Sequence, residues 1–443
     1  MPEPVALLGT TLEGGGQLLR IAVGAAALTC TPISIKNIRG NRKGAPGLKQ
    51  QHLTCVQWLA YASNAKTTGV RKKSINLSFS AESLAKSSVT LSDHEHIDIG
   101  SPGSISLILQ AILPFLIFSP TKTSQPRSIT IKGGSNVDLS PSYEYVEQVL
   151  FPTLSLIGLP AMTASFSERE WRQTNQGTGS VTYLIQSLRP GAHLPAFTLK
   201  DRGPVTNLHA TIFAPTEWQG HLETVFRAKV EEIMNSGRLL ITSHTERQDN
   251  NIISFQTGTG GLSRTIYVLL VAHTTTGHRL GRDRWFSKST PSSFASRIEA
   301  SASKAKSGSS QQSSSRKDLS EDLESMLGAL TRSAEELVED LMAEVEHGGC
   351  VDEFMRDQLV IYQALAKGKS FVDGGREEGS VEVEHELEDR EAVEDVQGIR
   401  TSKKSSLHTQ TAEWVCEEVL GARFNGEGEC EGVGWMAGVS KAI

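Results

Sequence analysis

Apolar positions along the chain follow two periods: every second residue in some segments, and three or four residues apart in others. Residues 5–36 combine both and predict a strand, a glycine-rich loop, a helix over 18–27 and a strand over 32–36. The same patterns predict further helices and strands up to residue 160, at 52–62, 75–80, 128–132 and 142–157. Strand, loop and helix thus recur at similar intervals, which indicates repeated αβ units, although no clean sequence repeat is present.

The strongest apolar run, 105–118, contains Gln110 and Pro114. It is too short to span a bilayer, which takes about 20 apolar residues. We interpret it as a buried helix or a helix–strand element. The N-terminus carries an acidic residue, Glu3, and only a short apolar stretch follows it, so we expect neither a signal peptide nor a membrane segment.

The second half of the chain changes character several times. Strand-like and helical patterns alternate from 180 to 285, which is enough for a small αβ domain. Serine, lysine and alanine dominate 286–316, where we expect disorder. The remaining features are an acidic amphipathic helix over 319–345, a second helix over 352–366 and a run dense in glutamate and aspartate over 373–397.

Composition limits the kinds of function that the chain can have. Its 443 residues, 38% of them hydrophobic, are ample for two domains with extra segments. The net charge of -6 excludes a protein that binds nucleic acid through an overall positive charge, so any RNA site must be a local basic patch. The five cysteines form no paired metal-binding spacing and indicate reduced thiols in a cytosolic or nuclear protein.

Two loops carry residue types that bind phosphate. Three glycines in Glu13-Gly14-Gly15-Gly16-Gln17 precede a predicted helix, where backbone N–H groups can approach an anion. A tight turn would use the same glycines, and no Gly-Lys-Ser/Thr follows to make a Walker motif. The second loop, within 38–52, places arginines and lysines among glycines, and arginine can hold phosphate oxygens in two places. A solvated surface loop would have the same composition.

One imidazole stands between hydroxyl residues near the C-terminus, in the run 406–411. The periodicity predicts a helix from Glu413 to Gly421 with Thr411 as its cap. His408 would then lie at the positive end of a helix dipole, where a phosphate is favoured and an imidazole could act as a nucleophile or a proton carrier. The alternative is a loop histidine without chemistry.

Five segments resemble motifs of the RNA 3′-terminal phosphate cyclase family and occur in the family's order. They are 12–20, 38–52, 132–136, 348–359 and 407–411, and they bracket nearly the whole chain. The first (Leu-Glu-Gly-Gly-Gly-Gln-Leu-Leu-Arg) and the last (Leu-His-Thr-Gln-Thr) are the most specific. The chain is therefore similar to the cyclase branch of this family, of the eukaryotic type.

The resemblance implies an α/β (α+β) fold in which three repeated αβ units form a large domain and a smaller αβ domain is inserted. The predicted division is 1–183 for the N-terminal part of the large domain and 184–285 for the inserted domain. A serine-rich disordered insertion follows at 286–318, and 319–443 completes the large domain, with the acidic insertion at 373–397.

The family converts an RNA 3′-phosphate into a 2′,3′-cyclic phosphate at the expense of ATP. A histidine becomes adenylated, AMP passes to the RNA 3′-phosphate, and the neighbouring 2′-hydroxyl displaces it. The resemblance therefore implies RNA 3′-phosphate ends, ATP and a divalent ion, Mg²⁺ or Mn²⁺, as ligands. It also implies a location in the nucleoplasm, or in the cytoplasm as well, and indicates neither a membrane nor a stable protein partner.

Carried over residue by residue, the resemblance assigns roles to the matching positions. His408 matches the adenylated histidine, and Glu13 is expected to hold the metal ion or to orient a catalytic group. Expected nucleotide contacts are Gln17, Asp357, Gln358, Gly14 and Gly15. Expected phosphate or RNA contacts are Arg20, Arg39, Arg42, Lys49, Gln51 and His52. Asp357 and Gln358 could instead orient the histidine or form a pair on a helix surface, and His52 could be a hydrogen-bonded residue at a helix start.

Some positions depart from the family pattern. The stretch 172–180 lacks the tyrosines, the proline and one glycine that many relatives carry before the inserted domain, and the basic segment near 280–285 is eroded. One alternative is therefore the family branch that lacks the catalytic histidine and acts in ribosome assembly, which His408 and the intact glycine loop argue against. Another is an enolpyruvyl transferase with repeated αβ units, which needs no such histidine.

Overall fold

The computed structural model describes residues 3–42, 46–82, 91–119, 125–168, 179–241, 252–259, 266–286, 312–381, 400–402 and 405–438. The chain divides into two compact units. The large unit consists of Met1–Asp201 with His347–Ile443, and the small unit of Arg202–Glu346.

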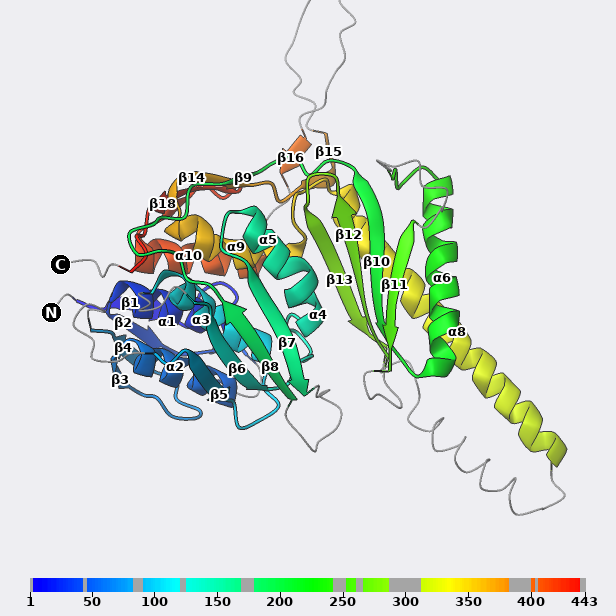
Figure 1. The fold of residues 1–443 in the computed structure, drawn as a ribbon, viewed down its shortest axis with the longest axis horizontal. Helices are drawn as coiled ribbons and strands as arrows, with labels where there is room; N and C mark the ends of the chain where they lie inside the picture. The colour runs from blue at the N-terminus through cyan, green and yellow to red at the C-terminus, as the bar shows by residue number, and fades with distance from the viewer. Residues whose placement is uncertain are drawn as a thin grey trace, which may run out of the picture. The chain divides into compact units, whose positions relative to one another are not determined.

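The large unit repeats one arrangement of strand, helix, strand, helix, strand and strand (Figure 1). In the first copy the elements are β1 (Val5–Leu8), α1 (Gln17–Thr29), β2 (Ile33–Lys36), α2 (Gln50–Ala62), β3 (Lys66–Thr68) and β4 (Leu77–Ser80). The sheet order is β1-β2-β4-β3, with β1 and β2 parallel and β4 antiparallel to both of its neighbours. Since parallel neighbours need a crossover, α1 packs on the sheet between β1 and β2.

The second copy has the same order and the same strand directions. Its elements are β5 (His94–Asp98), α3 (Ile105–Phe118), β6 (Arg127–Gly133), the helical segments α4 (Tyr143–Tyr145), η1 (Val146–Leu150) and α5 (Phe151–Leu156), β7 (Met162–Glu168) and β8 (Gly179–Ile185). The sheet order is β5-β6-β8-β7, with β5 and β6 parallel. The apolar run 105–118, which the sequence analysis interpreted as a buried helix or a helix–strand element, is thus one helix, α3. The Ser104 hydroxyl caps it.

The small unit interrupts the third copy of the repeat. The elements of this copy are β9 (Thr198–Leu199), α9 (Glu353–Leu365), β14 (Lys367–Val372), α10 (Leu407–Leu420), β17 (Arg423–Phe424) and β18 (Glu429–Val433). The sheet order β17-β18-β14-β9, with β9 and β14 parallel, again matches the first copy. The predicted α/β fold with three repeated units is confirmed, and the insertion falls in the first crossover of the third unit, between β9 and α9.

The first helices of the three copies, α1, α3 and α9, contribute to one apolar core. All residues of α1 are buried, and Gly24 lies at a close approach of α1 to α3: a Cβ there would be 2.6 Å from the Ala111 carbonyl oxygen. Within the described ranges, no helix is both long and apolar enough to span a membrane.

The second helix of each copy makes a polar contact with the start of the first helix of the next copy. In the first junction, Gln51 Oε1 on α2 accepts from the Ser104 N–H at the start of α3, over 3.2 Å. In the second, the Tyr145 hydroxyl on α4 donates to Asp352 Oδ1, the N-cap of α9, over 2.6 Å. The third junction, between α10 and α1, closes the set and contains the candidate site.

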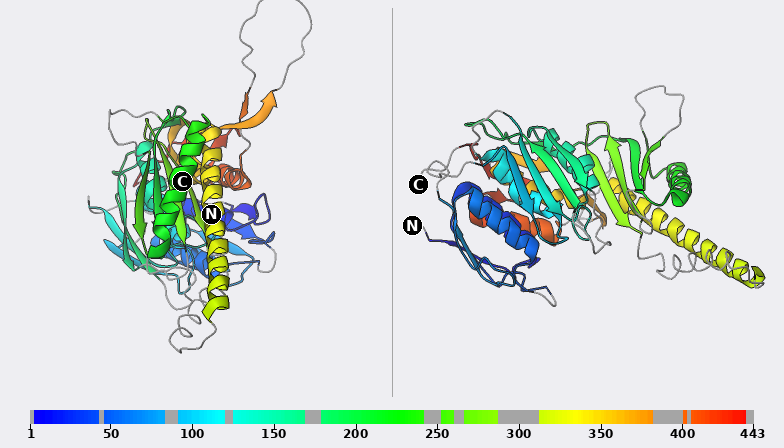
Figure 2. Two further views of the ribbon diagram at one scale, coloured as in Figure 1. Left: turned by 90° about the vertical axis from the view of Figure 1, so that its right-hand side faces the viewer. Right: turned by 60° about the horizontal axis from the view of Figure 1, so that its bottom comes forward.

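The small unit has one four-stranded sheet with two helices on one face. Its elements are β10 (Val205–Phe213), α6 (Thr216–Asn235), β11 (Ile253–Gly258), β12 (Tyr267–Thr274), β13 (Arg279–Trp285) and α8 (Gln312–Glu346). The sheet order is β11-β10-β12-β13. Helices α6 and α8 lie side by side, and their apolar residues share a core with the sheet (Figure 2).

This division differs from the predicted domain boundaries at 184, 285 and 319. Residues 179–185 form β8, which is hydrogen-bonded to β6 and β7 in the large unit. The acidic amphipathic helix, placed in the large domain by the sequence analysis, is α8 of the small unit. Its apolar stripe, which includes Leu330, Leu337 and Leu341, packs against the small sheet. The stripe shows that the helix needs an apolar partner surface, but it does not show which surface that is.

Two predicted insertions lie mostly outside the described residues. Of the serine-rich segment 286–318, only Phe286 and 312–318 are described; Phe286 is buried and α8 begins at Gln312. The sequence predicted disorder over this segment, whereas 312–318 are the first residues of α8. Of the acidic segment 373–397, the first nine residues are described, and they include β15 (Arg376–Val381), which pairs with β16 (Arg400–Ser402). The altered stretch 172–180 is described only at its last two residues, the start of β8.

Candidate active site

His408 is the second residue of α10, and its side chain is exposed. The helix starts earlier than predicted because Ser406, and not Thr411, is its N-cap: Ser406 Oγ accepts from the Thr409 N–H over 3.2 Å. The prediction of a helix from Glu413 with Thr411 as its cap was wrong, since several hydroxyl residues compete for the cap and only the fold selects one. The imidazole therefore lies within the first helical turn, where free backbone N–H groups attract anions.

A relay of amide and carboxylate groups fixes the orientation of the imidazole. Gln17, the first residue of α1, places Oε1 2.5 Å from His408 Nδ1 and donates from Nε2 to Asp357 Oδ2 over 2.8 Å. Asp357 Oδ1 accepts from Gln358 Nε2 over 2.7 Å. Burial raises the pKa of Asp357, which the two amide hydrogen bonds and His408 oppose.

The donor and acceptor chemistry of this relay determines the tautomer of His408. When Asp357 is ionised it only accepts hydrogen bonds, so the Gln17 group facing it is then the NH₂ group and the group facing His408 is the carbonyl oxygen. The Nδ1 atom must then carry a proton and donate it to Gln17. In the neutral ring this leaves Nε2 with its lone pair, as a nucleophile requires.

The glycine loop presents Glu13 to the same helix. The Glu13 N–H donates to Thr411 Oγ1 over 3.1 Å, and the Gly15 N–H donates to Glu13 Oε2 over 3.0 Å. Glu13 Oε1 pairs with Arg42. The predicted glycines are needed here: Gly14 has a φ of 60°, and a Cβ at Gly15 would lie 1.9 Å from Glu13 Oε1.

Arg20 and His52 lie behind the loop. A Cβ at Gly16 would be 2.6 Å from His52 Nε2 and 2.9 Å from Arg20 Nη1, so the loop backbone passes directly against both side chains. His52 Nδ1 accepts from the Lys49 N–H over 3.2 Å. Burial, followed by the charges of Arg20, Arg39 and Lys49, lowers the pKa of His52 to about 3. His52 is therefore neutral, with its proton on Nε2 toward the loop.

Arg20 also connects the loop to the relay. Its Nε donates to Gln110 Oε1 on α3 over 2.8 Å. Arg20, Gln110, Asp357 and Gln358 line a cavity of about 20 Å³ between α1, α3 and α9, with room for about one water molecule. The expected nucleotide and phosphate residues thus converge from the first and third repeats, and the second repeat contributes Gln110.

The remaining predicted contacts have partners within the fold. The Arg39 side chain is buried, 7% exposed, and donates to the Gly47 carbonyl oxygen, whereas the Arg42 side chain is 46% exposed beside Glu13. Lys49 is the N-cap residue of α2. Gln51 bonds the Ser104 N–H, so the structure gives this side chain a role in joining two repeats. Arg42 is therefore the more accessible of the two arginines for a substrate phosphate.

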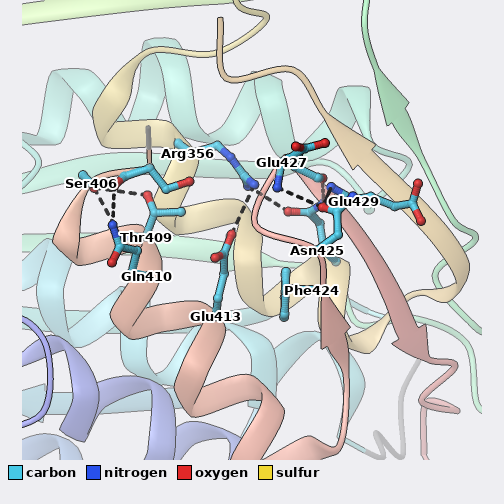
Figure 3. A network of polar contacts seen from close by, with 12 residues as sticks. Arg356, Ser406, Thr409, Gln410, Glu413, Phe424, Asn425, Glu427 and Glu429 are labelled. Atoms are coloured by element: carbon cyan, nitrogen blue, oxygen red, sulfur yellow. Dashed lines mark hydrogen bonds and ion pairs between the residues drawn. The ribbon is translucent and has the colours of Figure 1, made fainter. Parts of the chain in front are cut away.

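A second polar network holds the two site-bearing helices α9 and α10 together. Arg356 on α9 donates to Gln363 Oε1 over 2.8 Å and pairs with Glu413 on α10 over 3.4 Å (Figure 3). Both charged side chains are buried, and burial raises the pKa of Glu413 while Arg356 opposes that rise. Removing one partner of such a pair leaves an uncompensated buried charge, so the pair fixes the packing of α10 against α9.

Three residues at the site had no role in its chemistry assigned from sequence. Gln110 and Thr411 are polar residues that only the fold brings to Arg20 and Glu13. Phe354 precedes Asp357 by one helical turn, is 46% exposed and packs edge-on against Tyr145. Its signal in the sequence was an aromatic residue on the polar side of an amphipathic helix, where an exposed ring offers a stacking surface.

The donor set suits phosphate and supplies little for a tightly held metal. Among the described residues, no group of three or more histidine, cysteine, aspartate and glutamate side chains could hold a metal ion. Glu13 is a single carboxylate with an oxygen facing Arg42. Mg²⁺ is often held by one or two carboxylates together with substrate phosphates and water, so Glu13 fits an ion that arrives with a nucleotide.

These features define a class of site: an exposed helix N-terminus carries an oriented imidazole, with arginines, a glycine loop and a carboxylate around it. The family model described as RNA 3'-terminal phosphate cyclase matches residues 11–426, so the chain belongs to this family.

Three proteins that are named RNA 3'-terminal phosphate cyclases are similar in sequence to half or more of the chain. The chain is 28% identical to the "Probable RNA 3'-terminal phosphate cyclase" of Dictyostelium discoideum over 83% of this chain and 72% of that protein. It is 33% identical to the RNA 3'-terminal phosphate cyclase of Nostoc punctiforme over 54% of this chain and 66% of the relative. For the protein of that name in Hyperthermus butylicus, the identity is 28% over 84% of this chain and 87% of the relative.

Proposed function

We propose that this protein is an ATP-dependent RNA 3′-terminal phosphate cyclase that works through a covalent AMP adduct on His408. The relay from His408 through Gln17 to Asp357 is the observation that carries the proposal, together with the family membership. A proton held on Nδ1 leaves the Nε2 lone pair available at an exposed helix N-terminus. A histidine that only packed or capped the helix would not need this arrangement.

The reaction would proceed in three displacements at phosphorus. Nε2 of His408 attacks the α-phosphorus of ATP, a P–N bond forms and pyrophosphate leaves. A 3′-phosphate oxygen of the RNA then attacks the same phosphorus, which breaks the P–N bond and joins the two phosphates in an anhydride. Finally the 2′-hydroxyl loses its proton to water, its oxygen attacks the RNA phosphorus and AMP leaves. The last step is favoured because the hydroxyl is tethered beside its target.

The surrounding residues would bind and orient the anions. Arg42, whose side chain is partly exposed, would contact phosphate oxygens, while Arg20 and the His52 Nε2–H would support the glycine loop from behind. Phe354 offers its exposed ring to a base. Glu13 would hold a divalent ion, which supplies positive charge to the phosphates when bound. In cells we expect the protein to act in the nucleus, where RNA ends are processed.

Incubation with ATP labelled at the α-phosphate, followed by a denaturing gel, tests the proposal. We expect a labelled band with wild type that is lost in His408→Ala and is labile to acid but stable to base, as a phosphoramidate is. His96→Ala is a matched control, since His96 is another exposed histidine, on β5 away from the site, and this variant should keep the band. Folded wild-type protein that forms no adduct with either Mg²⁺ or Mn²⁺ would contradict the proposal and favour a non-enzymatic role in RNA processing.

A further inference from the structure

Thr411 joins the glycine loop to the helix that carries His408. Its Oγ1 accepts from the Glu13 N–H over 3.1 Å, although the two residues are 398 positions apart. The same hydroxyl donates to the Leu407 carbonyl oxygen over 2.7 Å. Because that bond uses the single hydroxyl proton, a lone pair of Oγ1 is directed to the Glu13 N–H. The Thr411 side chain is fully buried, so water cannot replace it at this position.

The glycine loop needs a hydrogen bond from outside the loop to stabilise its conformation. Leu12 has a φ of 53° and is 38% exposed, and Gly14 has a φ of 60°. A leucine in the left-handed region is strained, and an exposed side chain does little to compensate for that strain. The carboxylate of Glu13 bonds the Gly15 N–H two residues on, which shapes the loop internally but does not attach it to α10. Two hydrogen bonds connect this segment to α10: Gln17 bonds His408 where the loop ends, and the Glu13 N–H bonds Thr411. Only the second holds the backbone of Glu13 itself.

We infer that Thr411 is a positioning residue, which sets the location of Glu13 relative to His408 and so assembles the two halves of the site. The inference rests on the proposed function. Thr411 stands one helical turn after His408 on α10, so a bond to Thr411 fixes the loop relative to the imidazole itself. Thr411 contacts neither ATP nor RNA in this role; it acts through the backbone of Glu13.

Three variants separate positioning from simple packing. Thr411→Val keeps the side-chain volume and removes both hydrogen bonds, whereas Thr411→Ser keeps the hydroxyl. Thr153→Val is a matched control, because Thr153 is also a buried helical threonine and its Oγ1 donates to the carbonyl oxygen four residues earlier, over 2.8 Å, in α5. The measurement is the single-turnover rate of AMP-adduct formation at several ATP concentrations, alongside urea unfolding of each variant.

We expect Thr411→Val to lower the maximal rate constant of adduct formation about 10- to 100-fold, as small misplacements in active sites do. Thr411→Ser should restore most of that rate, and Thr153→Val should keep it while losing a similar amount of stability. A wild-type rate in Thr411→Val would overturn the inference, as would equal losses in the valine and serine variants, which would indicate packing alone. Absence of an adduct in wild type would instead contradict the proposed function.

Discussion

Two histidines stand in the first turns of equivalent helices, and their surroundings give them opposite properties. His52 is the third residue of α2 and His408 the second residue of α10. His52 is buried and its Nδ1 accepts from the Lys49 backbone, whereas His408 is exposed and its Nδ1 faces Gln17. The partner at Nδ1 decides which nitrogen holds the proton, so one ring is a donor behind the loop and the other is a nucleophile.

The buried state of His52 predicts that the protein is less stable in acid. Its pKa is about 3 in the folded chain and about 6.5 in the unfolded chain, so only the unfolded state binds a proton between these values. Stability therefore falls as the pH drops from about 6.5 toward 3. From pH 7 to pH 5 this one group should account for about 2 kcal/mol.

Urea unfolding of wild type and His52→Gln at pH 7 and pH 5 measures this contribution. The glutamine has no titrating group and can still accept from the Lys49 N–H, so it should show a smaller loss between the two pH values. His273, whose pKa burial lowers to about 4, contributes equally in both proteins and cancels. An equal loss in the two proteins would show that His52 is protonated without unfolding.

At the scale of the elements, close packing of α1 against α3 predicts the effect of a single methyl group. Gly24→Ala would place a Cβ 2.6 Å from the Ala111 carbonyl oxygen, which forces the helices apart at the centre of the large unit. We expect a loss of about 1–3 kcal/mol in unfolding free energy, despite the better helix propensity of alanine.

Gly220→Ala is the matched control for this prediction. Gly220 lies in α6, and a Cβ there would meet nothing within 4 Å. This substitution should stabilise the protein by up to about 1 kcal/mol, because only the propensity effect remains. Chemical denaturation of both variants checks the pair, and a neutral Gly24→Ala would show that α1 and α3 can move apart without cost.

At the scale of the whole molecule, the two residues that flank the acidic segment 382–399 lie next to each other. Val381 and Arg400 are paired in the β15–β16 ladder, so the ends of 382–399 are already neighbours. We expect replacement of 382–399 by a short glycine–serine turn to leave both folding and AMP-adduct formation near wild-type levels. Adduct formation and urea unfolding of this variant are the measurements. A folded variant without the adduct would assign the acidic segment a part in the reaction.

Sequence alone determined the parts that depend on neighbours in the chain. Periodicity identified most strands and helices, the glycines marked the loop that precedes α1, and the two terminal motifs indicated the family that the comparison then showed. The sequence failed to identify the N-cap of α10, because Ser406 and Thr411 are both suitable cap residues. The geometry of the whole turn selects between them.

Tertiary structure alone decided the contacts between distant residues. Gln17 and His408 are 391 positions apart and meet only because the third repeat closes against the first. The same closure placed Thr411 against Glu13, and the assignment of α8 to the small unit followed from the surface that its apolar stripe covers. A pattern in the chain specifies which face of an element must be buried, but the fold determines the partner of that face. The proton position on His408 depends on such a partner and was therefore not determined by the sequence.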